Sequence, residues 1–484
     1  MRSAWLGLAL VLACAPAAHA RELLPTVLHV HSTLSTGNTS LDELAATAER
    51  DGVGALFLTE NYLTRVDYGL PPFRALTRVT YEDNAVFPRL EDYFQKVAEL
   101  RQRFPKMLFV TGVEVIPHYY WSESPLSLEL RLNDTQKNML IFGLDAPALR
   151  TLPIIGNPGA RRPSLQTVVD VLPALLILPG LVVLSRPRVH RRRLGTAVIV
   201  VRQRRWLTGG LLIVIGVAAL VRAYPFTADR YAPWSDYGLD PHQTLIDAVQ
   251  AHGGSIIWSF PEAPDAGEKA FGAVKVVWKT EPYPDDLLRT SNYTAFGAVY
   301  EQTIRITRPG GQWDRVLTQY VKGERARPAW GVGEAGYHGR RTGKKLTTIQ
   351  TVLSVDQRTE AAALEALQRG RHYSVRRSDA LTLTMPEFGI TASGATAGAG
   401  DVLAVPAGTP LEVHATVDAA GGGAHGVRVT LVKNGEVAGA WAGTTPFRML
   451  LKDTAGAERA YYRLDARVSP GEYLVSNPIF VAPP

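Results

Sequence analysis

The chain has 484 residues, of which 46% are hydrophobic and 20% are charged. This length is enough for two or three domains, and the composition excludes general disorder. The net charge of +7 is concentrated in one stretch, residues 186–205, which contains eight arginines. Because the rest of the chain is nearly neutral, the sequence predicts no basic face for nucleic acid, and we expect no nucleic-acid partner.

Residues 1–20 are predicted to be a secretory signal peptide. An apolar stretch follows Arg2, and Ala18-His19-Ala20 is typical of a cleavage site. The only cysteine, Cys14, cannot form an intramolecular disulfide. The residues before it, Val11-Leu12-Ala13, resemble a bacterial lipobox, so lipidation of Cys14 is an alternative to cleavage after Ala20.

Residues 21–160 alternate between strand and helix patterns. Ser40 is a plausible N-cap for the first helix. The predicted strands are 26–32, 55–59, 107–115 and 139–144, and the predicted helices are 41–50 and 90–103. Such alternation predicts an α/β domain with a parallel sheet, either open or closed into a barrel.

Residues 165–222 are predicted to form a two-helix transmembrane hairpin. Two apolar runs, 168–184 and 206–221, flank the arginine-rich loop 186–205, and each is near the short end of the about 17–25 residues that cross a bilayer. Because arginine-rich loops remain in the cytoplasm, the bulk of the chain is expected outside it, in the periplasm of a Gram-negative cell. A hairpin buried in a soluble core is the alternative, but it leaves the arginines unexplained.

Residues 230–376 resume the alternating pattern, and residues 378–484 change it. Helices are predicted at 240–251, 313–322 and 359–369, and a strand at 255–260. Beyond residue 378 strands appear without helices, and Leu411 to Val417 alternate in period two. Asn434-Gly435 is a turn pair between two apolar runs. This last part is predicted to be a small all-β sandwich.

His29-Val30-His31 is the first motif that indicates chemistry. Residues at i and i+2 of a strand point to the same face, so both imidazoles are expected to converge. At the C-terminal end of a strand, this pair is a natural start for a metal site.

The surroundings of this motif resemble the polymerase and histidinol phosphatase (PHP) family. The residues that carry the resemblance are Leu28-His29-Val30-His31-Ser32, Ala55 to Asn61, Thr111 to Val115, Ile256 to Glu262, and Gly333 to His338, in the family order. It covers about residues 26–145 and 238–375, and it implies a distorted (β/α)7 barrel, here interrupted by the transmembrane hairpin. It also implies metal ions at the strand ends that hydrolyse phosphate esters.

The chain departs from the family at several ligand positions. His29, His31, Glu114 and His338 stand where ligands belong, and Glu60 replaces an aspartate. The other ligand positions hold Asn61, Asn138, Phe260 and Gly336. Phenylalanine and glycine offer no ligand atom, so a three-ion site is not expected. The resemblance therefore implies one zinc, manganese or iron ion at His29, His31 and Glu114, with Glu60 or His338 in addition, or no ion at all.

Two functions follow from this pattern. The first is a membrane-anchored, extracytoplasmic, metal-dependent hydrolase of phosphate esters or other small molecules, with a reduced metal site. The second is a catalytically inactive PHP-like pseudoenzyme that binds a ligand or a partner. The sequence identifies neither a catalytic residue beyond the metal ligands nor a particular protein partner.

Overall fold

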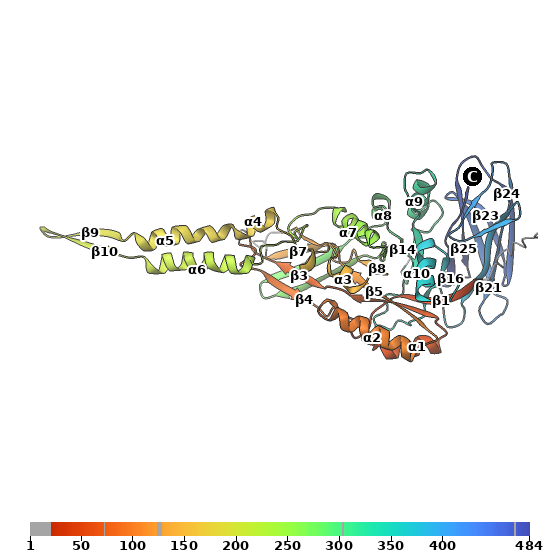
Figure 1. Cartoon of the computed structure of the whole chain (residues 1–484), viewed down its shortest axis with the longest axis horizontal. Coiled ribbons are helices and arrows are strands. Elements are labelled where there is room, and N and C mark those ends of the chain that lie inside the picture. Colours follow the sequence, from red (N-terminus) through yellow and green to blue (C-terminus); the bar gives the residue numbers. More distant parts are fainter. Residues whose placement is uncertain (1–20, 72, 123–127, 303, 469–470) are drawn as a thin grey trace, which may run out of the picture.

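The computed structural model describes residues 21–71, 73–122, 128–302, 304–468 and 471–484. The predicted signal peptide, with Cys14 and the cleavage site after Ala20, lies outside these residues. Figure 1 shows an elongated molecule with a helical hairpin at one end and the C-terminal β-sheets at the other. A mixed α/β body lies between them, and it contains the strands that surround the candidate site.

Seven strands form the centre of the body. Their spatial order is β15-β14-β11-β8-β5-β2-β1. Their bounds are Glu22–Val30 for β1, Ala55–Asn61 for β2, Leu108–Val115 for β5, Met139–Phe142 for β8, Ser255–Trp258 for β11, Ala295–Val299 for β14 and Trp330–Gly333 for β15. The backbone amides of Ala335 and Tyr337 donate to the carbonyls of Leu28 and His29, at 2.9 and 3.0 Å. The segment after β15 therefore lies beside β1 and joins the two ends of the row.

The prediction of a parallel sheet is wrong at one of these seven strands, and also at β16 (Ile349–Val355), which pairs with β1 in the antiparallel sense. β8 runs antiparallel to both of its neighbours, β5 and β11. Parallel neighbours need a crossover, usually a helix, whereas the described residues between β5 and β8 hold only the short strands β6 (Tyr120–Trp121) and β7 (Glu129–Asn133). The chain therefore turns back at the end of β5, and Asn138, just before β8, lies close to that end.

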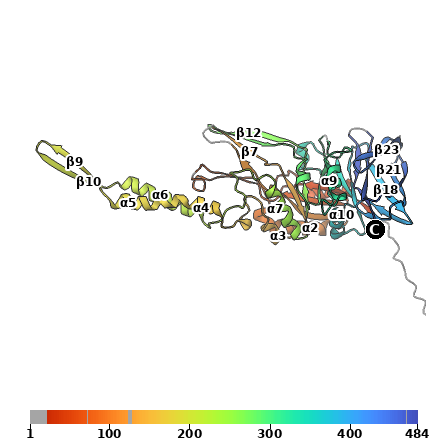
Figure 2. The same cartoon turned by 90° about the horizontal axis from the view of Figure 1, so that it is seen from above.

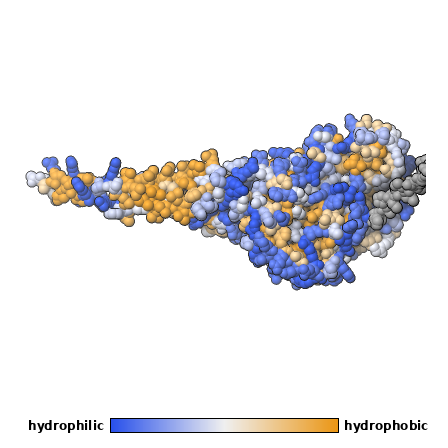
Figure 3. All heavy atoms as spheres, in the orientation of Figure 1, coloured by the Kyte–Doolittle hydropathy of each residue, from blue (hydrophilic) through white to orange (hydrophobic). Residues whose placement is uncertain are grey.

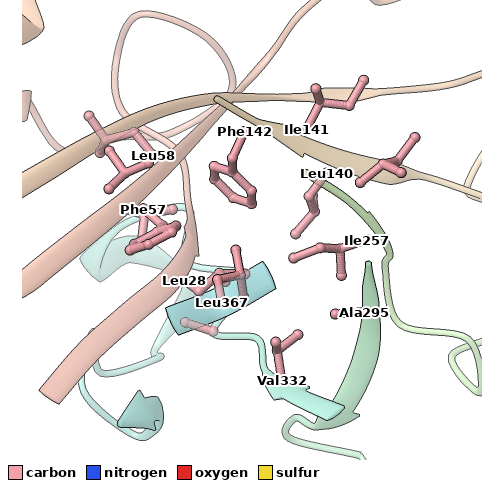
Figure 4. Packing of buried hydrophobic residues seen from close by; sticks show 14 of the residues in the cluster. Leu28, Phe57, Leu58, Leu140, Ile141, Phe142, Ile257, Ala295, Val332 and Leu367 are labelled. Carbon is pink, nitrogen blue, oxygen red and sulfur yellow. The ribbon is translucent and has the colours of Figure 1, made fainter. Parts of the chain in front are cut away.

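Helices pack around these strands where the sequence predicts them. They are α1 (Leu41–Arg50), α2 (Leu90–Arg103), α7 (Asp240–Ala251), α9 (Gln312–Val321) and α10 (Glu360–Arg369). Ser40 is the N-cap of α1, in a capping box with Glu43. Figure 4 shows apolar side chains from the strands and from α10 meeting in one core, among them Phe57, Phe142 and Ile257. Burying each such side chain contributes about 1.5–3 kcal/mol.

Shorter elements complete the body. Two small sheets lie apart from the seven strands, one of β3 with β4 and one in the order β12-β13-β7-β6. The bounds of the new strands are Arg65–Tyr68 for β3, Val79–Glu82 for β4, Asp265–Phe271 for β12 and Val274–Thr280 for β13. The short helices are η1 (Phe87–Arg89), α3 (Ala146–Arg150), η3 (Pro158–Ala160), α8 (Asp286–Arg289) and η5 (Arg340–Thr342).

The segment predicted to be a transmembrane hairpin projects from the body as two packed helical runs. The first is α4 (Leu165–Val171), η4 (Leu172–Leu176) and α5 (Ile177–Ser185), and the second is α6 (Trp206–Ala223). Both runs are long and apolar enough to cross a membrane, by length and composition, and few of their residues are buried. Figure 3 shows the apolar surface along them, with hydrophilic residues at both ends. A Cβ at Gly180 would lie 2.7 Å from the Ile213 side chain, so glycine permits this close packing.

The arginine-rich segment between the helices is not an irregular loop. Arg188–Leu194 and Ala197–Gln203 form the antiparallel strands β9 and β10. The turn between them includes Gly195, which has a φ of 61°, a left-handed conformation that glycine adopts without strain. The arginines therefore extend beyond the far end of the helices, in a β-hairpin (Figure 1).

The C-terminal part forms two sheets around a second apolar core. One sheet is β19-β18-β21-β24, with bounds Ala395–Gly398, Leu383–Ala392, Pro410–Ala419 and Phe447–Thr454. The other contains β20 (Val402–Ala404), β22 (Gly426–Lys433), β23 (Glu436–Thr444), β25 (Ala460–Arg467), β26 (Tyr473–Ser476) and β27 (Ile479–Ala482). It continues the large sheet, because β26 pairs with β17 (His372–Arg376), which pairs with β16 (Ile349–Val355). The predicted turn at Asn434-Gly435 joins β22 to β23.

Candidate metal centre

His29 and His31 lie at the end of β1. Glu114 lies near the end of β5, which is separated from β1 by β2. The expected convergence of the histidines is present, with ring centroids 5.1 Å apart. It is not produced by regular strand geometry, because His29 has a φ of 73° and the pairing with β2 shifts register there. Left-handed backbone at a residue other than glycine costs about 1–3 kcal/mol. Such a conformation persists only where the surrounding contacts maintain it.

The Glu114 carboxylate lies between the two imidazoles. Its Oε1 is 3.3 Å from His29 Nε2, and its Oε2 is 3.5 Å from His31 Nε2. One ligand atom from each of the three residues lies within 4.8 Å of the other two, and all three side chains are buried. Two imidazoles and one carboxylate form a donor set that suits zinc or iron.

A second carboxylate, Glu334, orients His29 from the other side. Its Oε2 is 3.1 Å from His29 Nδ1, and it accepts a hydrogen bond of 2.7 Å from the Ser259 hydroxyl. A carboxylate on Nδ1 favours the proton there and leaves Nε2 as the ligand atom. Neither Glu334 nor Ser259 was predicted as a site residue. The sequence signal that could have found them is their position. Glu334 directly follows the buried apolar strand β15, and Ser259 directly follows the buried apolar strand β11.

Two amides hold Glu114. Asn61 Nδ2 donates to Glu114 Oε2 at 2.9 Å, and Asn138 Nδ2 donates to Oε1 at 2.8 Å. These asparagines stand at two positions where the PHP resemblance implies histidine ligands. As donors to the carboxylate, they orient a ligand instead of binding an ion.

Glu60 lies outside the group formed by His29, His31 and Glu114. Its carboxylate accepts hydrogen bonds from the Ser32 amide, at 2.9 and 3.1 Å, and from the Ser35 hydroxyl. Burial raises its pKa above the ordinary value. Glu60 therefore closes the turn after β1, which accounts for a buried carboxylate at this position without an ion.

His338, also predicted as a ligand, flanks the cluster. Its ring stacks on His31 with centroids 4.1 Å apart and planes within 8°. Its Nδ1 lies 3.1 Å from the Thr36 hydroxyl. Burial lowers the pKa of His338, so its ring is neutral near pH 7. His338 lies outside the group of His29, His31 and Glu114. It is half-buried, whereas those three residues are buried.

Phe260 and Gly336 fit against each other beside His29. The Phe260 ring stacks on the His29 imidazole with centroids 4.9 Å apart. A Cβ at Gly336 would lie 2.7 Å from the Phe260 ring, and Gly336 has a φ of 52°. The aromatic ring thus occupies the space that a larger residue at 336 would need, so neither of these two positions offers a ligand atom.

The charges of the cluster are strongly coupled. Burial lowers the pKa of His29, but the carboxylates of Glu114 and Glu334 outweigh this effect and raise it to about 9. Burial raises the pKa of Glu114, but His29 and His31 outweigh this effect and lower it to about 2. Burial holds the pKa of His31 well below its ordinary value. Without a metal ion, the cluster therefore holds a His29–Glu114 ion pair beside a neutral His31.

Several buried polar atoms of the cluster lack a hydrogen-bond partner within the described part of the chain. They are both ring nitrogens of His31, Oε1 of Glu334 and Oδ1 of Asn138. A buried polar atom without a partner costs about 1–3 kcal/mol, and native structures rarely retain several together unless a ligand, water or ion satisfies them. The donor set and the free nitrogens of His31 fit a divalent ion.

Comparisons with known proteins add a general similarity. No protein-family model matches the chain, and no curated protein matches it. Among solved structures, it is similar to a two-domain protein containing a predicted PHP-like metal-dependent phosphoesterase from Bacteroides vulgatus, with a TM-score of 0.35, 11% identity and 96% of each chain covered. It is also similar to a protein from Bifidobacterium adolescentis named for a proposed metal-dependent phosphoesterase activity, with a TM-score of 0.28, 12% identity, and 67% of this chain and 91% of that chain covered. Both scores are too low to show a shared fold.

Proposed function

We propose that this chain is a membrane-anchored, extracytoplasmic hydrolase of phosphate esters that uses one divalent metal ion. The observation that carries the proposal is the buried group of His29, His31 and Glu114, in which His31 has no hydrogen-bond partner within the described residues. The seven strands, with hydrogen bonds joining the two ends of the row, support a PHP-like (β/α)7 barrel with this group at its strand ends. The three donors do not identify the metal, which could be zinc, manganese or iron.

Different residues of the chain have different roles at the proposed site. His29, His31 and Glu114 would hold the ion, which when bound supplies Lewis-acid polarisation of a phosphoryl oxygen. Glu334 fixes the ring of His29, and the two asparagine amides fix Glu114. His338 is neutral and half-buried beside His31, which makes it the residue suited to accept a proton at the open side of the site.

Membrane anchoring rests on the helical hairpin and its arginines. Two exposed apolar helices of sufficient length end in a β-hairpin rich in arginine, which the positive-inside rule assigns to the cytoplasm. The body would then lie on the opposite side of the membrane. A reporter active only in the cytoplasm should function when fused near Gly195 and fail when fused after Pro484. The opposite pattern would overturn this topology.

The site end of the strands lies toward the helical hairpin. β3, which follows Asn61 at the end of β2, lies beside the segment that leads into that hairpin, since Asp67 lies 3.9 Å from Arg161. Lys269 of β12 lies over the exposed rings of Tyr81 and Phe271, and Figure 2 shows β12 at the same end of the body. Aromatic and basic residues favour the membrane interface. This arrangement supports a site that opens toward the membrane surface.

A catalytically inactive, ligand-binding protein is the second candidate. The observation that favours it is the stacking of Phe260 on His29, which fills the space of two family ligand positions. A site with one ion and no room for a second would have lost part of the charge stabilisation that family members use for hydrolysis.

Metal analysis and turnover distinguish these two functions. The purified full chain should contain about one equivalent of a divalent metal, and His31→Ala should lose it because two remaining ligands hold an ion weakly. His372→Ala, which removes another buried histidine, is the matched control and should keep it. Hydrolysis of a model phosphate ester that His31→Ala abolishes would establish the enzyme. Retained metal with no turnover would establish the inactive binding protein, and no metal under any loading condition would contradict the proposed centre.

A further inference from the structure

Three arginines and a tyrosine form a row across four neighbouring strands of the large sheet. Arg428 of β22 is opposite Arg467 of β25, Arg467 is opposite Tyr473 of β26, and Tyr473 is opposite Arg376 of β17. Residues that are directly opposite in antiparallel pairs project to the same face of a sheet. The four side chains therefore share one face, at the junction between the body and the C-terminal sheets.

This row lines a cavity of about 680 Å³. The opposite wall is the segment after β14, which contributes Glu301, Arg308 and Pro309. Four guanidinium groups thus border one cavity although they come from four separate segments of the chain. The volume is within the range of about 300–1,000 Å³ that small-molecule sites occupy.

The charges around this cavity are only partly balanced by carboxylates. Asp465 pairs with Arg467, whose guanidinium also lies over the Tyr473 ring at 4.4 Å. Glu301 pairs with Lys344 at 2.9 Å. Within the described residues, Arg308, Arg376 and Arg428 have no carboxylate partner, although Arg376 donates to the Glu301 carbonyl at 2.9 Å.

Such an arrangement costs stability in the absence of a ligand. Like charges directly opposite on adjacent strands are destabilising, and here Arg428 faces Arg467. The half-buried position of Arg376 reduces the screening of its charge by water. A bound anion would relieve the repulsion, because the planar fork of arginine matches the oxygens of phosphate and carboxylate groups.

We propose that this arginine pocket binds a small molecule or polymer segment that carries two or more phosphate or carboxylate groups. Arg308, Arg376 and Arg428 would contact the anionic groups, and Thr430, which also lines the cavity, offers a hydroxyl. The pocket is close to the candidate metal centre, since the Lys344 ammonium that pairs with Glu301 would be 3.9 Å from a Cβ at Gly336. Binding in the pocket does not require turnover at that centre.

Calorimetric titration of the full chain in detergent, with inorganic pyrophosphate and with citrate, tests the proposal. The titrations use the His31→Ala background as well as the wild type, so that phosphate held at a metal ion is excluded. At low salt we expect saturable binding of one equivalent that weakens as salt is added. The tighter of the two anions identifies the chemistry that the pocket prefers.

A pair of double variants decides whether the pocket is responsible. Arg308→Gln with Arg428→Gln removes two exposed guanidinium groups of the cavity and should weaken binding at least tenfold. Arg448→Gln with Lys452→Gln removes two exposed cations of β24, outside the cavity, and should leave the affinity unchanged. Equal affinity of the two double variants, or no saturable binding of either anion to the wild type, would overturn the proposal. An unchanged circular dichroism spectrum confirms that each variant is folded.

Discussion

Two buried clusters of charged residues in this protein differ in how completely their polar atoms are satisfied. At the junction of α9 and β25, Asp314 and Arg463 form a bidentate pair with bonds of 2.7 and 2.6 Å. The Tyr461 hydroxyl and the Gly310 amide donate to the two Asp314 oxygens as well, at 2.9 and 2.8 Å. Both Asp314 oxygens therefore accept two hydrogen bonds each, and the Arg463 guanidinium lies over the Trp313 ring.

The cluster of His29, His31 and Glu114 is as deeply buried but less complete. Both nitrogens of His31 lack a hydrogen-bond partner within the described residues, and its closest carboxylate oxygen is 3.5 Å away. In the first cluster Arg463 Nη1 lacks a hydrogen-bond partner within the described residues, but both Asp314 oxygens and the other two guanidinium nitrogens are bonded, and the pair joins the body to the C-terminal sheets. The second retains donor atoms directed at one another, which is the expected state of a site that is completed by an ion. Burial alone does not separate a structural ion pair from a binding site. The number of buried polar atoms without a hydrogen-bond partner distinguishes the two clusters.

The largest effect is expected at the Asp314–Arg463 cluster, the more completely bonded of the two. Asp314→Ala leaves the Arg463 charge buried and unpaired, and it should lower the free energy of unfolding by about 3–5 kcal/mol. Denaturation followed by tryptophan fluorescence measures this loss. Glu365→Ala, which removes an exposed partner of Arg369 on α10, should cost about 0.3–0.5 kcal/mol. Similar costs for the two variants would show that the buried Asp314–Arg463 pair contributes no more to stability than an exposed pair does.

At the incomplete cluster the main effect should be on metal binding. Glu114→Gln removes the charge that faces both histidines, and it should weaken metal binding more than the about 10–100-fold typical of outer-shell changes. Competition with a chromogenic chelator measures the affinity. Glu60→Gln alters an equally buried carboxylate outside the group and should bind metal like the wild type. If Glu60→Gln and Glu114→Gln lose metal equally, the assigned ligand set is wrong.

A smaller effect is expected from the residues that orient His29. Glu334→Gln should reduce metal affinity about 10–100-fold, because it weakens the bond that holds His29 Nδ1. Ser259→Ala, which removes one donor to Glu334, should have a smaller effect in the same direction. The same chelator competition ranks the two variants. An unaltered affinity in Glu334→Gln would show that this carboxylate has no part in the metal centre.

The smallest step, counted per unit of pH, is expected in the pH dependence of metal binding. The pKa of His29 is raised to about 9 in the metal-free protein, so an ion must displace its proton at lower pH. Affinity should therefore rise about tenfold per pH unit from pH 7 toward 9 and then level off. The pKa of Glu114, about 2, adds no proton in this range. Calorimetry in buffers of different ionisation enthalpy should detect about one proton released at pH 7, and none released would contradict the assigned charges.

Much of the fold was predictable from local signals. The helices α1, α2, α7, α9 and α10 lie within a residue or two of the predicted ranges, because apolar periodicity and caps such as Ser40 act within one or two turns. The turn at Asn434-Gly435 follows from residues that accept positive φ. The direction of β8 was not predictable, since it depends on how the chain turns between strands and not on the composition of the strand.

For the candidate site, the sequence by itself determined the identity and the order of His29, His31 and Glu114, and tertiary structure decided their roles. Glu60 satisfies the turn after β1, while Glu334 approaches His29 from a strand about three hundred residues away. The arginine row likewise exists only because four distant strands pair in one register. Residue type sets which atoms can bind an ion, but distance and hydrogen-bond satisfaction come from long-range packing, which leaves no periodic signal in the chain.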